Sequence, residues 1–157
     1  MSNFISSESG ERPAPSKQVA TFRVGDMIFG IDVMMVQEVI RFQRMTAVPL
    51  APKSVKGLIN LRGQILTAID LREILGMEPR GIDELPMNVV IQSGQDVMSL
   101  LVDKIDDVFE LDPRRIESTP DTLDEEYKNL LGSVYKLDPG LLLILNPEKV
   151  SRFSEDL

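Results

Sequence analysis

The stretch GLINLRGQIL, Gly57–Leu66, contains two apolar runs that meet at Arg62-Gly63. Such a pattern predicts a strand, a tight turn and a second strand, with the glycine in the turn. Arg62 is the unexpected residue, because a guanidinium here is not required by the turn. An arginine at a strand end can lay its stem over apolar surface while its charge stays in water. It can also be displayed for a partner, and the pattern leaves both interpretations open.

Outside this stretch, short apolar segments are bounded by Gly, Pro, Asn or Asp, which is typical of β-strands joined by turns. Residues 33–42 have apolar positions at helical spacing, so they predict one or two helical turns that run into a strand. Short helices are predicted at Leu71–Gly76, near Leu123–Tyr127 and from Pro147 onward. The other predicted strands cover residues 18–24, 27–32, 58–63, 64–70, 87–93, 97–103, 104–111, 133–137 and 141–146.

The second half of the chain resembles the first at a constant offset of 69 residues, weakly in identity and better in order. Residues 57–66 and 132–143 correspond more loosely, each as strand, turn and strand. The repeat suggests two five-strand β-units, split near residues 76–87, and short strands at this spacing favour small barrels over a parallel sheet. The matched pairs are Gly25 with Gly94, Ile28 with Val97, Ile31 with Leu100, Val33 with Val102, Val36 with Ile105, Glu38 with Asp107 and Val39 with Val108.

The composition excludes several classes of function. The chain has 157 residues, 43% of them apolar, which suits one domain or two small halves with a common core. Its net charge of −8 argues against nucleic acid or an anionic membrane surface as the main partner. It has no Cys and no His, which excludes disulfides, thiol chemistry, the commonest general base and the commonest metal ligand. No apolar run is long enough to span a bilayer and no signal peptide is recognisable, so we expect a cytoplasmic protein.

Clusters of acidic residues leave catalytic alternatives open. Paired carboxylates can hydrolyse glycosides or bind cations, so a small β-barrel hydrolase is one alternative. Neither cluster has the ligand pattern and central glycine of a calcium loop, and a solvated loop or face is favoured. Asp70 ends a strand, as does the phosphate-accepting residue of a signalling receiver, but capping of the next helix explains it better. The clusters are Asp103, Asp106 and Asp107, and Asp121, Asp124, Glu125 and Glu126.

Glu38 offers a partner for Arg62. It is a lone acid between Val36 and Val39, and the flat guanidinium of Arg62 suits a carboxylate. An exposed pair of this kind stabilises a fold by only about 0–1 kcal/mol. In an apolar groove the same pair would give register and specificity to a partner.

The segments VQEVI (Val36–Ile40) and VKGLINLRGQILTAIDLREILG (Val55–Gly76) resemble the CheW chemotaxis adaptor family. The most specific signature is the order NLRG (residues 60–63), a strand and DLR (residues 70–72). GIDVMMVQEVI and VMSLLVDKIDDV also resemble the family, and the likeness covers about residues 18–152.

The resemblance implies a mainly β fold with two small five-stranded SH3-like β-barrels packed on a shared core, and a few short helices. It implies one CheW-like domain over residues 17–152, with subdomains at roughly 17–80 and 81–152 that can exchange strands or a helix. Residues 1–16, rich in Ser, Glu and Pro, are predicted to be a disordered tail, and residues 153–157 a C-terminal tail.

The resemblance also implies an adaptor with no catalytic activity and no cofactor, coupling transmembrane chemoreceptors to the CheA histidine kinase in signalling arrays. The hairpin tip of a receptor would bind between the barrels, and the kinase regulatory domain, which has the same fold, would bind on the barrel flanks. The expected receptor-binding residues are Val36, Glu38, Val39, Arg62, Val102 and Ile105. The expected kinase-binding residues are Phe42, Met45, Val48 and Ile65.

As an adaptor, the protein is expected to be cytoplasmic and recruited to membrane receptor arrays, where other copies of itself are further candidate partners. Neither nucleic-acid binding nor membrane insertion is expected. A close alternative is a CheW-like coupling protein of a non-flagellar pathway, such as one for surface motility, development or gene control.

Overall fold

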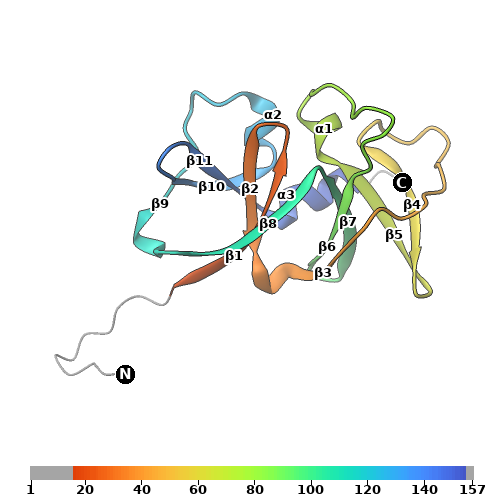
Figure 1. The fold of residues 1–157 in the computed structure, drawn as a ribbon, viewed down its shortest axis with the longest axis horizontal. Helices are drawn as coiled ribbons and strands as arrows, with labels where there is room; N and C mark the ends of the chain where they lie inside the picture. Colours follow the sequence, from red (N-terminus) through yellow and green to blue (C-terminus); the bar gives the residue numbers. More distant parts are fainter. Residues whose placement is uncertain (1–15, 155–157) are drawn as a thin grey trace.

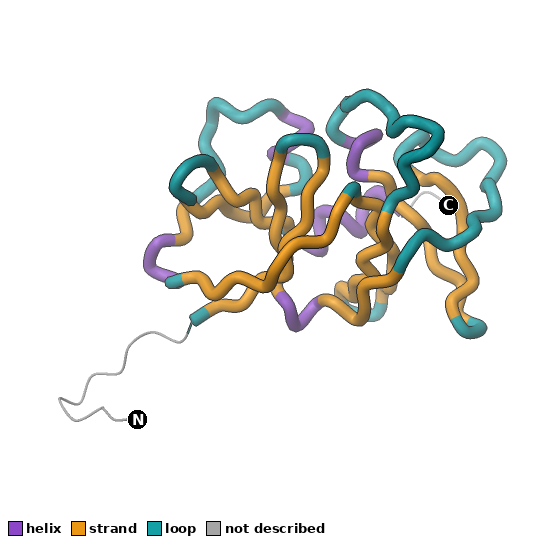
Figure 2. The backbone as a smooth tube through the Cα atoms, viewed as in Figure 1, coloured by secondary structure: helices purple, strands orange, loops and turns teal. Residues whose placement is uncertain are grey.

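The computed structural model describes residues 16–154, and strands make up about half of them (Figures 1 and 2). Gly25 and Gly94 form two equivalent turns, with φ of 61° and 62°. This left-handed conformation suits glycine because it has no Cβ. Each turn joins two predicted strands that pair antiparallel, so hairpins form at both positions.

Eleven strands, three α-helices and three 3-10 turns follow one another along the described residues. The strands are β1 (Lys17–Val24), β2 (Met27–Asp32), β3 (Val36–Ile40), β4 (Val55–Leu61), β5 (Gln64–Asp70), β6 (Met87–Ser93), β7 (Asp96–Val102), β8 (Lys104–Leu111), β9 (Ile116–Glu117), β10 (Leu131–Lys136) and β11 (Leu141–Leu145). The helices are α1 (Leu71–Ile74), α2 (Glu125–Lys128) and α3 (Pro147–Ser151), and the 3-10 turns are η1 (Val33–Met35), η2 (Pro113–Arg115) and η3 (Arg152–Ser154).

These strands form two sheets with the same internal order. Sheet A runs β8-β1-β2-β11-β10-β9 and sheet B runs β3-β6-β7-β5-β4. Replacing each strand of sheet B by its counterpart in the other half of the chain reproduces the first five strands of sheet A. The last strand, β9, corresponds to a single bridge between Thr46 and Leu58 in sheet B. The predicted repeat is confirmed, and it extends to the topology.

The two halves of the chain exchange strands. The β1–β2 hairpin lies in sheet A, but β3, β4 and β5 join the second-half hairpin β6–β7 in sheet B. Conversely, β8, β9, β10 and β11 join β1–β2 in sheet A. A cut at residues 80–81 would separate β5 from β6, which belong to the same sheet. The predicted subdomain boundary therefore does not coincide with the division between the sheets, because each sheet combines strands from both halves of the chain.

The register of the pairs follows the repeat closely. Val36 lies opposite Ile91, and 69 residues further on Ile105 lies opposite Phe22. The hairpins β4–β5 and β10–β11 have the same register at an offset of 76 residues. Each of these pairs has a β-bulge at the same place, so the two halves share backbone irregularities as well as strand order.

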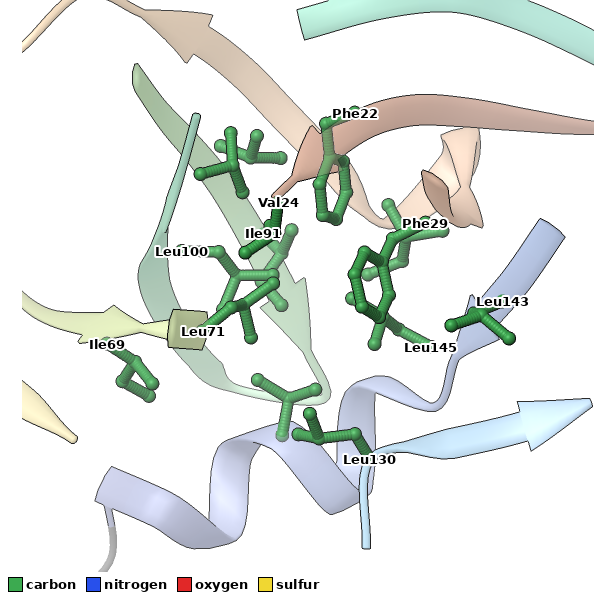
Figure 3. Close-up of a cluster of buried hydrophobic side chains, with 14 of the residues drawn as sticks. Phe22, Val24, Phe29, Ile69, Leu71, Ile91, Leu100, Leu130, Leu143 and Leu145 are labelled. Carbon is green, nitrogen blue, oxygen red and sulfur yellow. The ribbon is translucent and has the colours of Figure 1, made fainter. Parts of the chain in front are cut away.

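A shared apolar core lies between the sheets (Figure 3). Phe22 and Phe29 of sheet A stack with ring centroids 6.1 Å apart, and Leu100 and Ile91 of sheet B pack in the same cluster. Full burial of each such side chain contributes roughly 1.5–3 kcal/mol. Smaller clusters fill the outer side of each sheet. The predicted mainly β fold on a shared core is confirmed, and closure of each sheet into an SH3-like barrel stays a prediction.

The remaining structural predictions concern helices and tails. The predicted short helices correspond to α1, α2 and α3, and the predicted helical turn before β3 is η1. No helix within residues 16–154 is long and apolar enough to cross a membrane. The predicted N-terminal tail lies outside the described residues except for Ser16. In the predicted C-terminal tail, Phe153 packs against the shared core, and residues 155–157 lie outside the description.

A candidate partner-binding surface on two edge strands

The edge strands β3 and β8 expose apolar side chains at equivalent positions. Val36 and Val39 lie opposite buried residues of β6, and Ile105 and Val108 lie opposite Phe22 and Ala20 of β1. Residues directly opposite in an antiparallel pair share a face, so all four side chains lie on the side of the shared core. Val39, Ile105 and Val108 are nevertheless 40%, 36% and 54% exposed. The sheet margins therefore leave apolar surface uncovered.

A bulge in each edge strand produces this arrangement. On β8 the pairing with β1 shifts between Ile105 and Val108, which places these residues, three apart, on one face. On β3 the shift lies between Val36 and Glu38. Glu38 consequently lies opposite Val90, on the other face of the strand from Val36 and Val39. The candidate surface therefore wraps around the edge of β3.

Val102, predicted to line the receptor groove, does not belong to this surface. It ends the central strand β7, is 0% exposed and packs in the shared core. Its side chain cannot reach a partner without disruption of the core, so its predicted role is wrong for this fold. Val108 is instead an exposed apolar residue of this surface, and the repeat offset that pairs it with Val39 was the signal that could have identified it.

Arg62 sits at the tip of the β4–β5 hairpin in an unusual conformation. Its φ is 52°, and Gly63 follows with φ of 89°, so both central turn residues are left-handed. Asn60 Oδ1 accepts a hydrogen bond from the Gly63 N–H at 2.9 Å, which closes the turn. A left-handed conformation is unfavourable for arginine and favourable for glycine or asparagine. Turn stability therefore does not account for an arginine at this position.

The predicted pairing of Arg62 with Glu38 is confirmed. Arg62 Nη2 donates to Glu38 Oε2, with the arginine side chain 71% exposed and the glutamate 27% exposed. The pair joins β3 to the β4–β5 hairpin, which lies at the opposite edge of sheet B. A pair this exposed contributes little to stability.

The other half of the repeat lacks this pair. At the equivalent positions stand Asp107, on β8, and Asp138, in the turn between β10 and β11. Two acids cannot form an ion pair, yet the second hairpin has the same register as the first. The backbone therefore does not require Glu38–Arg62, and the pair is a feature of one side of the molecule only.

The expected kinase-binding residues have unequal exposure. Ile65, near the tip of β5, is 58% exposed, and Phe42, after β3, is 37% exposed. Met45 packs partly against the small core cluster of sheet B, and Val48 is half-buried. Only Ile65 and Phe42 therefore present substantial apolar surface.

The structure separates the acidic residues into different environments. Asp70 is 5% exposed, and its Oδ1 accepts the Arg72 N–H at 3.0 Å, which confirms the predicted helix cap. Asp103 is half-buried and paired with two arginines, so its predicted place on a solvated face is wrong. Asp121 and its acidic neighbours are exposed or half-exposed, as predicted. No group of three or more potential metal-ligating side chains occurs within residues 16–154.

Asp103 holds two arginines and a backbone amide. Arg72 donates to both carboxylate oxygens at 3.0 and 2.6 Å, and Arg80 Nε donates to Oδ1 at 2.7 Å. The Gly25 N–H donates to Oδ2 at 2.7 Å. Burial opposes ionisation of Asp103, but the bonds from Arg72 and Gly25 and the charge of Arg80 prevail and lower its pKa to about 2. The carboxylate is therefore ionised under all mild conditions.

Acid should destabilise the protein through Asp103. Its pKa is about 2 in the folded protein against a usual 3.8, so ionisation stabilises the fold above the higher value. About 2 kcal/mol should be lost as the pH falls from about 5 to 2. Unfolding free energies measured by denaturant titration over this range should show the loss. Asp103→Asn should make the unfolding free energy depend less on pH over this range. Asp106→Asn, in an exposed pair with Arg23, should leave the pH dependence unchanged.

Comparison with known proteins shows which family this chain belongs to. The profile of the CheW-like domain matches residues 18–155. A probable chemotaxis protein CheW from Rhizobium etli is 30% identical over 139 residues, 88% of each chain. The chemotaxis protein CheW from Klebsiella aerogenes is 33% identical over 132 residues, 82% of this chain and 78% of its own.

The fold agrees with a solved structure as well. The crystal structure of the scaffolding protein TtCheW from Thermoanaerobacter tengcongensis matches with a TM-score of 0.75 and 27% identity. The match covers 83% of this chain and 89% of that one. The sequence profile and the solved structure each match most of the chain, and this chain belongs to the CheW-like domain family.

Proposed function

We propose that this protein is a non-catalytic adaptor of a chemotaxis signalling pathway, which couples transmembrane chemoreceptors to the CheA histidine kinase. Family membership and the chemotaxis relatives support the pathway. The observation that carries the receptor role is the Glu38–Arg62 pair. It is exposed, it uses an arginine in an unfavourable backbone conformation, and the equivalent hairpin folds without it.

The receptor would bind on the edge strands. Val36, Val39, Ile105 and Val108 would receive the apolar face of a receptor helix, and Arg62 with Glu38 would bind its polar side chains. Helix recognition by an apolar surface with one or two polar contacts is a common mode, in which a few anchors dominate the affinity.

The kinase would bind at a separate face. Phe42, Met45, Val48 and Ile65 all belong to sheet B or the loop that precedes β4, and Ile65 and Phe42 supply the exposed surface. One adaptor could then hold both partners at once. In the cell it would be cytoplasmic and recruited to receptor arrays, where other copies of it could also bind. A non-flagellar signalling pathway would use the same two faces.

A binding assay with two baits tests this function. The first bait is the cytoplasmic hairpin tip of a chemoreceptor, and the second is the CheA regulatory domain, both from the same source as the adaptor. Binding to both, with Arg62→Ala weakening only the first interaction, is the expected result. Binding to neither by a well-folded sample would contradict the proposal.

A charge at Ile65 should weaken binding to the kinase domain without weakening binding to the receptor. Ile65→Asp places a carboxylate on exposed apolar surface, so it should reduce affinity for the kinase domain by at least about tenfold. Affinity for the receptor tip should stay within twofold of wild type. Ile82→Asp is the matched control, because Ile82 is 98% exposed in a different loop. Equal losses in both variants would show a nonspecific effect of charge.

A further inference from the structure

Four charged residues, which we call the clamp, form a connected set of ion pairs: Asp70, Arg72, Arg80 and Asp103. Arg80 connects the two acids, because Nε donates to Asp103 at 2.7 Å and Nη1 donates to both oxygens of Asp70 at 3.1 and 3.0 Å. The side chains of Arg80 and Asp70 are only 9% and 7% exposed. The charges sum to zero, and every carboxylate oxygen accepts a hydrogen bond, so burial of the clamp is compensated.

The clamp joins the two sheets at the point where the chain crosses between them. Asp103 is the single residue between β7, in sheet B, and β8, in sheet A. Its carboxylate accepts from Gly25 of the β1–β2 turn, and its N–H donates to Arg23 O at 2.9 Å, both in sheet A. The arginines that hold the same carboxylate follow β5 of sheet B. Asp103 is therefore bonded directly to sheet A and, through Arg80, which also donates to Asp70 of β5, to sheet B.

The first half of the repeat has no such clamp at its own crossing. The residue equivalent to Asp103 is Met34 of η1, which is 84% exposed. There, Asp32 accepts from the Met34 N–H, a contact confined to the turn. Among the described residues, one crossing is thus fixed by long-range ion pairs and the other by a local hydrogen bond.

The location matters because the proposed receptor surface has a part on each sheet. Val39, Glu38 and Arg62 belong to sheet B, whereas Ile105 and Val108 belong to β8 of sheet A, directly after Asp103. The core between the sheets is apolar, and apolar contact is non-directional. The clamp adds directional bonds to this packing, and these restrict how the two parts of the surface can shift relative to each other.

We propose that Asp103 is a positioning residue for receptor binding: with Arg72 and Arg80 it holds the two sheets so that both parts of the edge-strand surface fit one receptor helix. This inference rests on the proposed receptor role. The proposed kinase residues all lie on the side of sheet B, so a change between the sheets leaves that surface intact. The clamp therefore affects one partner and not the other.

Affinities of the full chain for the receptor hairpin tip and for the CheA regulatory domain test the inference. Asp103→Asn should raise the Kd for the hairpin about tenfold, because the surface is no longer preorganised. Its Kd for the kinase domain should stay within twofold of wild type. Arg72→Lys, which keeps the charge and loses the two-pronged contact, should give a smaller loss of the same kind and remains usable if Asp103→Asn does not fold.

Two controls separate positioning from general destabilisation. Asp106→Asn removes a nearby carboxylate from an exposed pair and should leave both affinities unchanged. Leu142→Ala creates a cavity in the outer core of sheet A, and it lowers Tm without contact with the clamp. If Leu142→Ala weakens receptor binding as much as Asp103→Asn at equal loss of Tm, the inference is overturned.

The outcomes also distinguish the inference from the proposed function. A wild-type chain that binds no hairpin tip removes the receptor role and the inference with it. Wild-type binding together with unchanged affinity of Asp103→Asn removes the inference alone. Hydrogen exchange gives an independent reading, because the Gly25 amide should exchange faster in Asp103→Asn if the bond between the sheets is lost.

Discussion

Glu38→Arg should weaken binding to the receptor hairpin tip about a hundredfold, because it places two positive charges together where an ion pair now stands. Kinase-domain affinity should stay at the wild-type level. The variant should fold, since Glu38 lies on an edge strand and an exposed ion pair contributes only about 0–1 kcal/mol to stability. Titration calorimetry with each partner measures both affinities on one sample.

The double exchange Glu38→Arg with Arg62→Glu tests whether the receptor contacts these two charges directly. It restores an ion pair but reverses the polarity that a partner meets. If the pair only holds the hairpin against β3, the exchange should recover binding. If the receptor contacts these charges, binding should stay weak, and this is the result we expect.

Arg62→Asn completes the series without disturbing the turn. Asparagine adopts positive φ more readily than arginine, so the hairpin should keep its shape and its stability should not fall. A loss of receptor affinity in this variant would come from the missing guanidinium. Wild-type affinity in Arg62→Asn would contradict the proposed receptor contact.

Local patterns in the sequence were sufficient for the hairpins. Alternating apolar residues around Gly25, Gly63 and Gly94 predict strand, turn and strand, because both the alternation and the turn are set by neighbouring residues. The pairing of Glu38 with Arg62 could also be anticipated from charge and shape. The exchange of strands between halves could not, because the choice of partner strand depends on which faces the whole chain buries.

The predictions for Val102 and Asp103 were wrong because contacts between residues far apart in the sequence decide their burial. The family resemblance predicts Val102 in the groove, but Val102 ends the central strand β7 and is buried by the packing of the two sheets, whereas Ile105 and Val108 lie on the exposed edge strand β8. The acidic neighbours of Asp103 predict a solvated position for it as well. Its partners Arg72 and Arg80 lie 31 and 23 residues away, and no local signal connects them.

The shared core makes the two sheets one cooperative unit, and Phe29→Ala should show it. Phe29 is 0% exposed, stacks on Phe22 and packs in a cluster that includes residues of sheet B. Truncation of a buried phenylalanine costs about 3–5 kcal/mol, a large part of the roughly 5–15 kcal/mol of a typical domain. Chemical denaturation should show a single transition that moves to lower denaturant. Ile82→Ala, at a fully exposed position, should change the free energy of unfolding by less than about 0.5 kcal/mol.

The single transition follows from the exchange of strands. If each half of the chain folded on its own core, Phe29→Ala would lower one transition and leave a second in place. In this topology β2 pairs with β11, and β5 pairs with β7, so each sheet needs strands from both halves. Loss of packing at Phe29 therefore weakens both sheets together. Two separate transitions, one of them unchanged by the substitution, would show that the sheets are energetically independent despite their shared core.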